Sequence, residues 1–343
     1  MGKQDLLAKK YMSDNEKFAD VFNYYLYNGE QVIKSESLHE ESISEIALPY
    51  SEKYKNIFIE KYRDIIKKCV IKSDNHYTYF LLGIENQSEV HYAMPVRNML
   101  YDSLNYSGQV NRIEKNHKKK KDKLNSAEYL SGITKSDKIT PVITLVLYWG
   151  NEAWDGPKSL YEMFKETDLD ILRYVNDYHI NLIEPKDIKD FSKFRTGLGK
   201  VLEFINASDS LEKMKEILAN NHEYYLHMDI ESARMIEIFG RTKIDMKQYE
   251  KNKEEVDMCK AIEDMVFEGK QQGIEEGMQA GVKKGIEEGM QAGVKKGIQE
   301  GLQALIEVAK ELGITTDIIE KKVEEKFDLS KDEAVEAVKK YYN

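Results

Sequence analysis

The sequence predicts an α/β protein with an added helical region and a helical glycine-repeat tail. One observation is a continuous β-branched and apolar run at 139–149, which is typical of a strand buried on both faces of a sheet. A second is the three- and four-residue spacing of apolar residues across much of 165–250, which favours helices. The third is a glycine at every fourth position from 269 to 301. The chain of 343 residues has room for about two domains.

The first helix is predicted over residues 5–27, where apolar side chains recur at helical spacing. The pair Asn28-Gly29 is a typical helix end. Asp20 lies at the margin of the apolar stripe of this helix. Two interpretations of Asp20 are open, a solvated carboxylate or a member of a site.

A β-hairpin is the next predicted element. The segment 61–71 fits either a helix or a strand, and the polar residues 73–75 form a turn signal. The apolar and aromatic run 76–84 has strand character. If the first segment is a strand, the hairpin brings Asp64 near its start beside Glu85, which directly follows the second strand.

Glu85 stands where the apolar run ends, and Gln87 follows two residues later. A buried carboxylate is costly to desolvate, so Glu85 either has a chemical role or marks the exit of the strand into solvent. An Asp and a Glu at adjacent strand ends suit Mg²⁺, which binds few carboxylates and keeps several waters. A metal held there can activate water for attack on a phosphodiester. Gln87 points to the same face and can orient that water but cannot accept its proton.

A helix is predicted from Met94 to Leu104, with Pro95 in its first turn. The lysine-rich segment 115–123 follows and is interpreted as a solvated loop or as a contact to phosphate backbone.

The tail carries an exact repeat. GIEEGMQAGVKK occupies 273–284 and again 285–296. Helix is the predicted state, although each glycine costs roughly 1 kcal/mol relative to alanine in a helix interior. The segment 269–301 therefore needs a close-packed partner or frays, which leaves self-association and a free spacer as alternatives. Residues 314–343 are predicted to form a helical hairpin with a structural or docking role.

Composition narrows the class of protein. The chain is 41% hydrophobic and 33% charged, with a formal net charge of −10, which does not by itself indicate a nucleic-acid-binding protein. Cys69 and Cys259 form no metal or redox spacing, so a reducing cytoplasm is expected. The longest apolar run, 142–149, is far shorter than the ~20 residues of a membrane span. The sequence contains no P-loop, HExxH or GxSxG motif, and its histidines show no ligand spacing.

Several segments in combination carry a resemblance to a known family. They are FADVFN at 18–23, RD at 63–64, GIENQ at 83–87, MPVRNMLYDSLNY at 94–106 with Gln109, and LYWGNEAWDGPKSLYEMF at 147–164. With them the chain resembles the recombination-promoting nuclease and transposase (YhgA-like) family, a branch of the PD-(D/E)XK nuclease superfamily. The likeness covers about residues 5–240, and the glycine-repeat tail is similar to the variable tails of that branch.

The resemblance implies a restriction-endonuclease-like α-β-β-β-α-β core and Mg²⁺-dependent cleavage of double-stranded DNA, with Mn²⁺ as an alternative metal and a link to recombination or mobile elements. It implies Asp64 and Glu85 as metal ligands and Gln87 at the position where the superfamily usually has lysine. A glutamine supplies no positive charge, so catalysis is expected to be slow, to recruit another cation such as Arg97, or to be absent.

Further residues of the motif are accessory candidates, with helix packing as the alternative to a DNA contact. They are Asp20, Arg97, Tyr101, Asp102, Tyr106 and Gln109. The expected organisation is a nuclease-like core over 1–165, a helical extension over 166–250, the glycine-repeat helix over 251–312 and the helical hairpin over 313–343. The competing function is a weakly active or inactive protein that binds DNA or a partner and assembles through its repeat tail.

Overall fold

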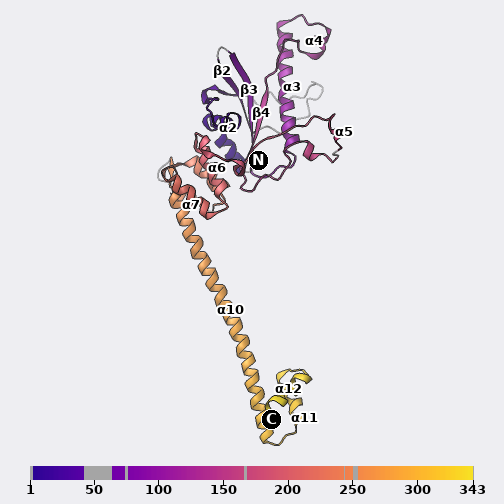
Figure 1. Cartoon of the computed structure of the whole chain (residues 1–343), viewed down its shortest axis with the longest axis vertical. Coiled ribbons are helices and arrows are strands. Elements are labelled where there is room, and N and C mark those ends of the chain that lie inside the picture. The colour runs from indigo at the N-terminus through magenta and orange to yellow at the C-terminus, as the bar shows by residue number, and fades with distance from the viewer. Residues whose placement is uncertain are drawn as a thin grey trace. The chain divides into compact units, whose positions relative to one another are not determined.

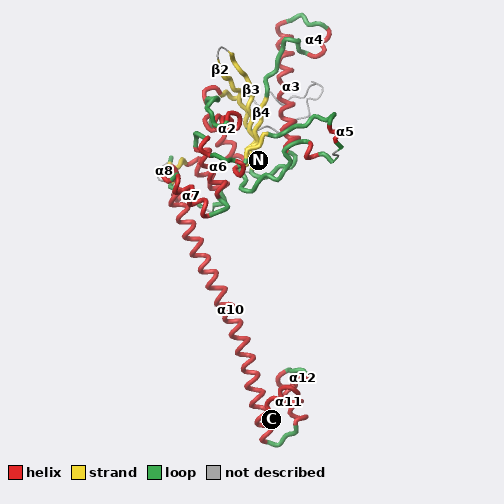
Figure 2. Tube along the Cα trace, in the orientation of Figure 1, coloured by secondary structure: helices red, strands yellow, loops and turns green. Residues whose placement is uncertain are grey.

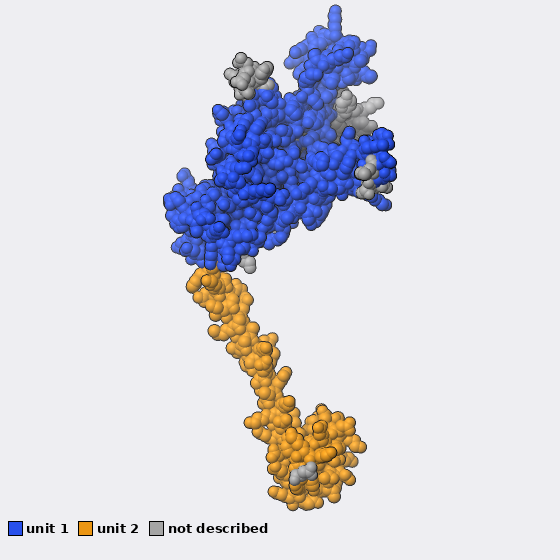
Figure 3. Space-filling view, in the orientation of Figure 1, with its two compact units in different colours: residues 1–265 blue, residues 266–343 orange. Residues whose placement is uncertain are grey.

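The structure is a computed structural model. It describes residues 3–41, 64–73, 76–165, 168–242, 244–249 and 254–342. The chain forms two compact units, residues 1–265 and 266–343 (Figure 3). The first unit contains both the expected core and the expected helical extension.

A five-stranded mixed sheet is the centre of the first unit (Figures 1 and 2). Its strands lie in sequence order and are β1 (Leu38–Glu40), β2 (Ile65–Ser73), β3 (His76–Gln87), β4 (Val142–Tyr148) and β5 (Asn181–Ile183). β1, β2 and β3 pair antiparallel, whereas β3, β4 and β5 pair parallel. The sheet and its helices confirm the predicted α/β class.

The predicted hairpin forms between β2 and β3. Ile65 pairs with Ile84 at one end and Ser73 with His76 at the other. The strand interpretation is therefore correct for 65–73, a segment rich in β-branched residues. Residues 61–63 and the turn residues 74 and 75 lie outside the described residues.

The first helix of the sequence prediction is two helices, α1 (Lys3–Met12) and α2 (Asn15–Tyr27). The break comes at Asp14, whose side chain accepts hydrogen bonds from the backbone N–H groups of Glu16 and Lys17 and caps α2. The predicted end is confirmed, since Asn28 adopts a left-handed conformation with φ of 54°. These helices cover one face of the sheet.

α3 (Met94–Lys120) begins where predicted but continues for 27 residues. The expectation of a loop over 115–123 is therefore wrong for 115–120. Lysine has good helix propensity, and basic side chains in a last turn interact favourably with the helix dipole. Lys121, with φ of 57°, ends the helix, and the short helix α4 (Ser126–Ser131) follows before β4.

The region expected to be helical is helical in part, because loops and short strands separate its helices. Its helices are α5 (Leu169–Leu172), α6 (Gly197–Ala207), α7 (Leu211–Asn220), α8 (His222–Leu226) and α9 (Ile230–Phe239). Its strands are β5 of the main sheet and β6 (Met228–Asp229), which pairs with β7 (Glu255–Val256). α6 packs against α2, α7 and α9, so this region belongs to the same core as the N-terminal helices.

The glycine repeat lies in one helix, α10 (Met258–Glu311), which begins in the first unit and continues into the second. The predicted helical hairpin is confirmed as α11 (Thr316–Phe327) and α12 (Lys331–Tyr342). The hairpin packs on the end of α10 through a cluster of buried residues, Leu302, Ile306, Ala309, Ile319, Val323, Ala334 and Val338. Within the described ranges, no helix combines the length and apolar character needed to cross a membrane.

Candidate active site

The register of the hairpin places Asp64 across from Glu85. Ile65 pairs with Ile84, and one further step of the same antiparallel register sets Asp64 opposite Glu85. Directly opposite residues project to the same face, with Cβ atoms about 5 Å apart. Both carboxylates are buried, with exposed fractions of 5% for Asp64 and 0% for Glu85. The sequence prediction that the hairpin brings these residues together agrees with this placement.

Asp64 is held by the backbone of β3. Its Oδ2 accepts a hydrogen bond of 2.9 Å from the N–H of Asn86. Burial raises the pKa of the Asp64 carboxyl, while the hydrogen bond from Asn86 and the charges of Arg97 and Lys9 oppose this change without cancelling it. The ionised form of Asp64 is therefore disfavoured by its surroundings and would gain from a nearby cation.

Arg97 of α3 is the cation in contact with Glu85. Its Nη2 atom lies 3.0 Å from Glu85 Oε2. Arg97 Nε donates a hydrogen bond of 3.1 Å to the hydroxyl of Tyr101, one turn further along α3. Burial opposes the charge of Arg97, but the attraction of Glu85, together with Tyr101 and Asp64, raises its pKa. Arg97 therefore stays protonated beside the two carboxylates.

Tyr101 packs beside Arg97. Its ring centroid lies 5.6 Å from the Arg97 guanidinium carbon. Burial raises the pKa of the Tyr101 phenol, and the charge of Glu85 acts in the same direction. The hydroxyl accordingly remains protonated at neutral pH.

Gln87 is buried on β3 beside β4. It pairs with Tyr148, and its backbone carbonyl accepts a hydrogen bond of 2.8 Å from the N–H of Trp149. The side-chain Nε2 donates to the carbonyl oxygen of Asn86 at 2.9 Å. As the residue two positions after Glu85, Gln87 lies on the same face of the sheet. The amide can offer Oε1 to a water or a metal, but it carries no charge.

Asn86 points to the opposite face and was missed by the sequence analysis. Its Oδ1 accepts a hydrogen bond of 3.0 Å from Trp149 Nε1, and the Trp149 ring contacts that of Tyr11 in α1 at 6.3 Å between centroids. Asn86 thus fixes β3 to its neighbours on one side while its N–H holds Asp64. The alternation of side chains along the strand GIENQ was the signal for Asn86, because it places Asn86 on the face opposite to Glu85 and Gln87.

Lys67 was also missed. It is 1% exposed on the face of β2 that α1 and α2 cover, and its Nζ donates to the carbonyl of Ser13 at 2.6 Å and to Asn15 Oδ1. Burial lowers the pKa of Lys67. Ile65 and Cys69, two positions before and after Lys67, are buried on that face. This strand spacing was the signal that Lys67 is buried as well. The contacts of Lys67 secure the connection between α1 and α2.

Asp20 lies on the side of the sheet opposite to Glu85, because α2 covers the face that carries Lys67. Its carboxylate is 2% exposed and accepts hydrogen bonds from the N–H of Arg195 and from the N–H and hydroxyl of Thr196 at 2.7–2.9 Å. Asp20 therefore anchors the segment that precedes α6.

Asp102 and Gln109 connect α3 to the sheet. The Asp102 carboxylate accepts hydrogen bonds from Thr144 Oγ1 at 2.8 Å and from the Tyr178 hydroxyl at 2.6 Å. Gln109 bonds both backbone groups of Thr140 through its side chain. These contacts agree with the interpretation that Asp102 and Gln109 pack α3 against the sheet.

Tyr106 and the lysines of α3 lie along the same helix. The Tyr106 hydroxyl accepts a hydrogen bond of 3.1 Å from the N–H of Val142. The lysines at 118–121 and 123 are exposed. His117, inside the basic segment, contacts the carboxylates of Asp122 and Asp137 at 2.7 Å each, and these hydrogen bonds raise its pKa.

The donor set at the hairpin fits a hydrated divalent cation. Two buried carboxylates and one amide share a face, and Arg97 offsets one of the two negative charges. Mg²⁺ needs only one or two protein carboxylates because it retains waters. Among the described residues, no group of three or more His, Cys, Asp or Glu side chains is arranged to hold a metal. Comparisons of this chain with protein-family models, with curated proteins and with solved structures return no match.

Proposed function

We propose that this protein is a metal-dependent DNA endonuclease that hydrolyses phosphodiester bonds, with Asp64 and Glu85 as ligands of Mg²⁺ or Mn²⁺. The observation that carries the proposal is the placement of these two buried carboxylates opposite each other on one face of the β2–β3 hairpin. Burying two like charges together is costly unless a cation compensates them. A divalent metal is a direct form of that compensation.

The order of elements supports the proposal. A helical segment, three antiparallel strands, α3 and the parallel strand β4 follow one another along the chain. This is the α-β-β-β-α-β order of the restriction-endonuclease-like core that the resemblance implies. Asp64 directly precedes the second of these strands, and Glu85 lies on the third.

In this proposal each side chain has a distinct role. A bound metal would lower the pKa of the water that it holds and would stabilise the charge that develops on the phosphodiester. Asp64 and Glu85 hold it, and the Gln87 amide orients the attacking water. Arg97 supplies the positive charge that a lysine at position 87 would have provided, because its guanidinium already lies beside Glu85.

Double-stranded DNA is the proposed substrate, and the exposed lysines near the end of α3 are proposed phosphate contacts. Cytoplasmic location is part of the same proposal, and it is supported by two buried free cysteines. The resemblance extends the proposal to a role in recombination or mobile elements.

The test is cleavage of supercoiled plasmid in Mg²⁺ and, separately, in Mn²⁺. We expect the wild type to nick or linearise the plasmid, EDTA to stop the reaction, and Asp64→Asn and Glu85→Gln to reduce it to background. Glu89→Gln is the matched control, since Glu89 is an exposed carboxylate that follows the same strand. An inactive wild type, or a Glu85→Gln variant as active as the control, would remove the proposal.

The contact between Arg97 and Glu85 favours one alternative. An arginine that already neutralises Glu85 at 3.0 Å, beside an uncharged Gln87, also suits a protein that binds DNA or a partner without cutting. Calorimetric titration of Mg²⁺ separates the two functions. DNA binding that persists in EDTA, with no heat of metal binding and no cleavage, would establish the alternative.

A further inference from the structure

A continuous apolar stripe runs along α10 in the second unit. Seven side chains recur at every fourth position and are 37–67% exposed, namely Ile274, Met278, Val282, Ile286, Met290, Val294 and Ile298. A glycine precedes each of them. For the glycines from 269 to 297, an added Cβ would meet no atom within 4 Å. The surface is therefore a row of apolar ridges and open backbone recesses.

We propose that this surface pairs with the same surface of a second copy of the chain, antiparallel, about a two-fold axis between Gly285 and Ile286. The pairing specifies the self-association that the repeat tail suggested, and it is independent of the metal chemistry at the hairpin. Exposed apolar rows of this length on a soluble protein commonly mark an interaction surface. The sequence of the repeat determines which partner fits.

Charge complementarity identifies the partner as a second, reversed copy. With the axis at this position, every glutamate and lysine between 275 and 296 lies at the same level along the helix pair as a residue of opposite charge on the other copy. The facing pairs are Glu275 with Lys296, Glu276 with Lys295, Lys283 with Glu288, and Lys284 with Glu287. A parallel partner in the same register would set glutamate against glutamate and lysine against lysine, which is unfavourable.

The same reversal exchanges apolar side chains with glycines. Ile286 faces Gly285 of the other copy, Val282 faces Gly289, and the remaining ridges continue this pattern. Glycine at a crossing lets two helix backbones approach closely. Because the stripe advances by four residues and a helical turn takes 3.6, the helices maintain contact by crossing in the right-handed sense.

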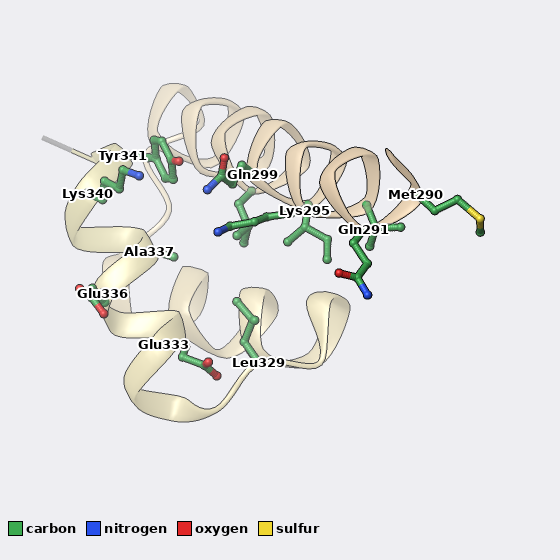
Figure 4. Close-up of a pocket in the computed structure, with 13 residues that line it drawn as sticks. Met290, Gln291, Lys295, Gln299, Leu329, Glu333, Glu336, Ala337, Lys340 and Tyr341 are labelled. Carbon is green, nitrogen blue, oxygen red and sulfur yellow. The ribbon is translucent and has the colours of Figure 1, made fainter. Parts of the chain in front are cut away.

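A groove beside the stripe provides the second half of the docking surface. Met290, Val294 and Ile298 of α10 and the facing side of α12 line an open groove with a volume of about 940 Å³. Figure 4 shows α10 as one wall and Ala337 and Tyr341 on the other.

The proposed register passes the partner's segment 273–281 along this groove. That segment brings two apolar side chains, Ile274 and Met278, and the acidic pair Glu275 and Glu276. Lys295 and Lys340 line the groove together with Glu333 and Glu336, and in this register Lys295 lies level with Glu276 of the partner segment.

The experiment uses the full chain and measures its mass in solution by sedimentation equilibrium. We expect the wild type to be a dimer of the 39.9 kDa chain. Lys283→Glu with Lys284→Glu places glutamates opposite Glu287 and Glu288 and is expected to weaken self-association at least about tenfold. Adding Glu287→Lys and Glu288→Lys to that variant is expected to restore the dimer. These positions are exposed, and circular dichroism verifies that helicity is unchanged.

Disulfide trapping tests the direction of the partner. Gln279 and Ala292 face each other in the antiparallel register. A mixture of Gln279→Cys and Ala292→Cys chains is expected to cross-link, whereas either variant alone is not. A monomeric wild type, a dimer insensitive to Lys283→Glu with Lys284→Glu, or stronger cross-linking of Gln279→Cys with itself would overturn the proposal. Glu85→Gln should leave the dimer unchanged, so failure of the nuclease and failure of the pairing are distinguishable.

Discussion

Replacement of Arg97 by glutamine removes the guanidinium that lies 3.0 Å from the fully buried Glu85 carboxylate. Loss of one partner from a buried ion pair costs about 3–5 kcal/mol, because the remaining charge is left without compensation. The Arg97 side chain is 26% exposed, so water can partly replace it. We therefore expect Arg97→Gln to lower the free energy of unfolding by about 3 kcal/mol, the low end of that range.

The assay is urea denaturation at pH 7 in EDTA, with the double variant Arg97→Gln and Glu85→Gln completing a mutant cycle. If the cost comes from the isolated charge of Glu85, the second substitution should recover about 2 kcal/mol or more. Arg173→Gln is the matched control, since Arg173 pairs with Asp170 at the surface and its loss should change stability by less than about 0.5 kcal/mol.

Addition of Mg²⁺ extends the same measurement to the proposed metal site. A ligand at one hundred times its dissociation constant stabilises the folded protein by about 2.7 kcal/mol. Mg²⁺ should therefore offset a large part of the loss in Arg97→Gln but not in the double variant, which lacks the Glu85 charge. A cost below about 1 kcal/mol for Arg97→Gln, or the same cost in the Glu85→Gln background, would refute the assignment of Arg97 as the charge partner of Glu85.

Two further predictions concern buried titratable groups. Asp64→Asn is expected to stabilise the metal-free protein at pH 7, because burial raises the pKa of Asp64. A raised folded-state pKa costs the wild type stability as pH rises above the ordinary carboxyl range, so the advantage of Asp64→Asn in thermal melts should vanish as pH falls through that range. A variant less stable at every pH would contradict this. Burial also raises the pKa of Cys69 to about 11, so in a Cys259→Ser background maleimide at pH 7.5 should label the native thiol at least about 100-fold more slowly than the unfolded one. Equal rates would show that Cys69 is accessible.

The hairpin was predictable in part, because some of its information is local. The polar turn and the aromatic run of β3 indicated a hairpin that sets Asp64 beside Glu85, but the segment 61–71 fitted a helix as well as a strand, and the pairing of β2 with β3 decides for the strand. The contact of Arg97 with Glu85 was suggested only as a way to replace the missing lysine. Its geometry depends on how α3 lies across the sheet, which no sequence spacing determines.

Other features escaped the sequence for different physical reasons. The helix break at Asp14 leaves apolar spacing intact on both sides, so periodicity does not detect it, and only the capping side chain does. The three-residue strands β1 and β5 are too short to show alternation. Lysines at the end of α3 form a helix that a charge pattern alone cannot distinguish from a loop.

The exact repetition within α10 has a consequence for how the gene for this chain can change. One copy of GIEEGMQAGVKK spans 12 codons. Its duplication or loss changes the length of the helix by about 18 Å and rotates one end relative to the other by about 120°. Each copy contributes one acidic and one basic pair in the same order. In the proposed antiparallel pairing, an added copy would therefore move the centre by half a copy and leave every charged pair matched. Replication slippage can therefore alter the length of this helix while it preserves the self-complementarity.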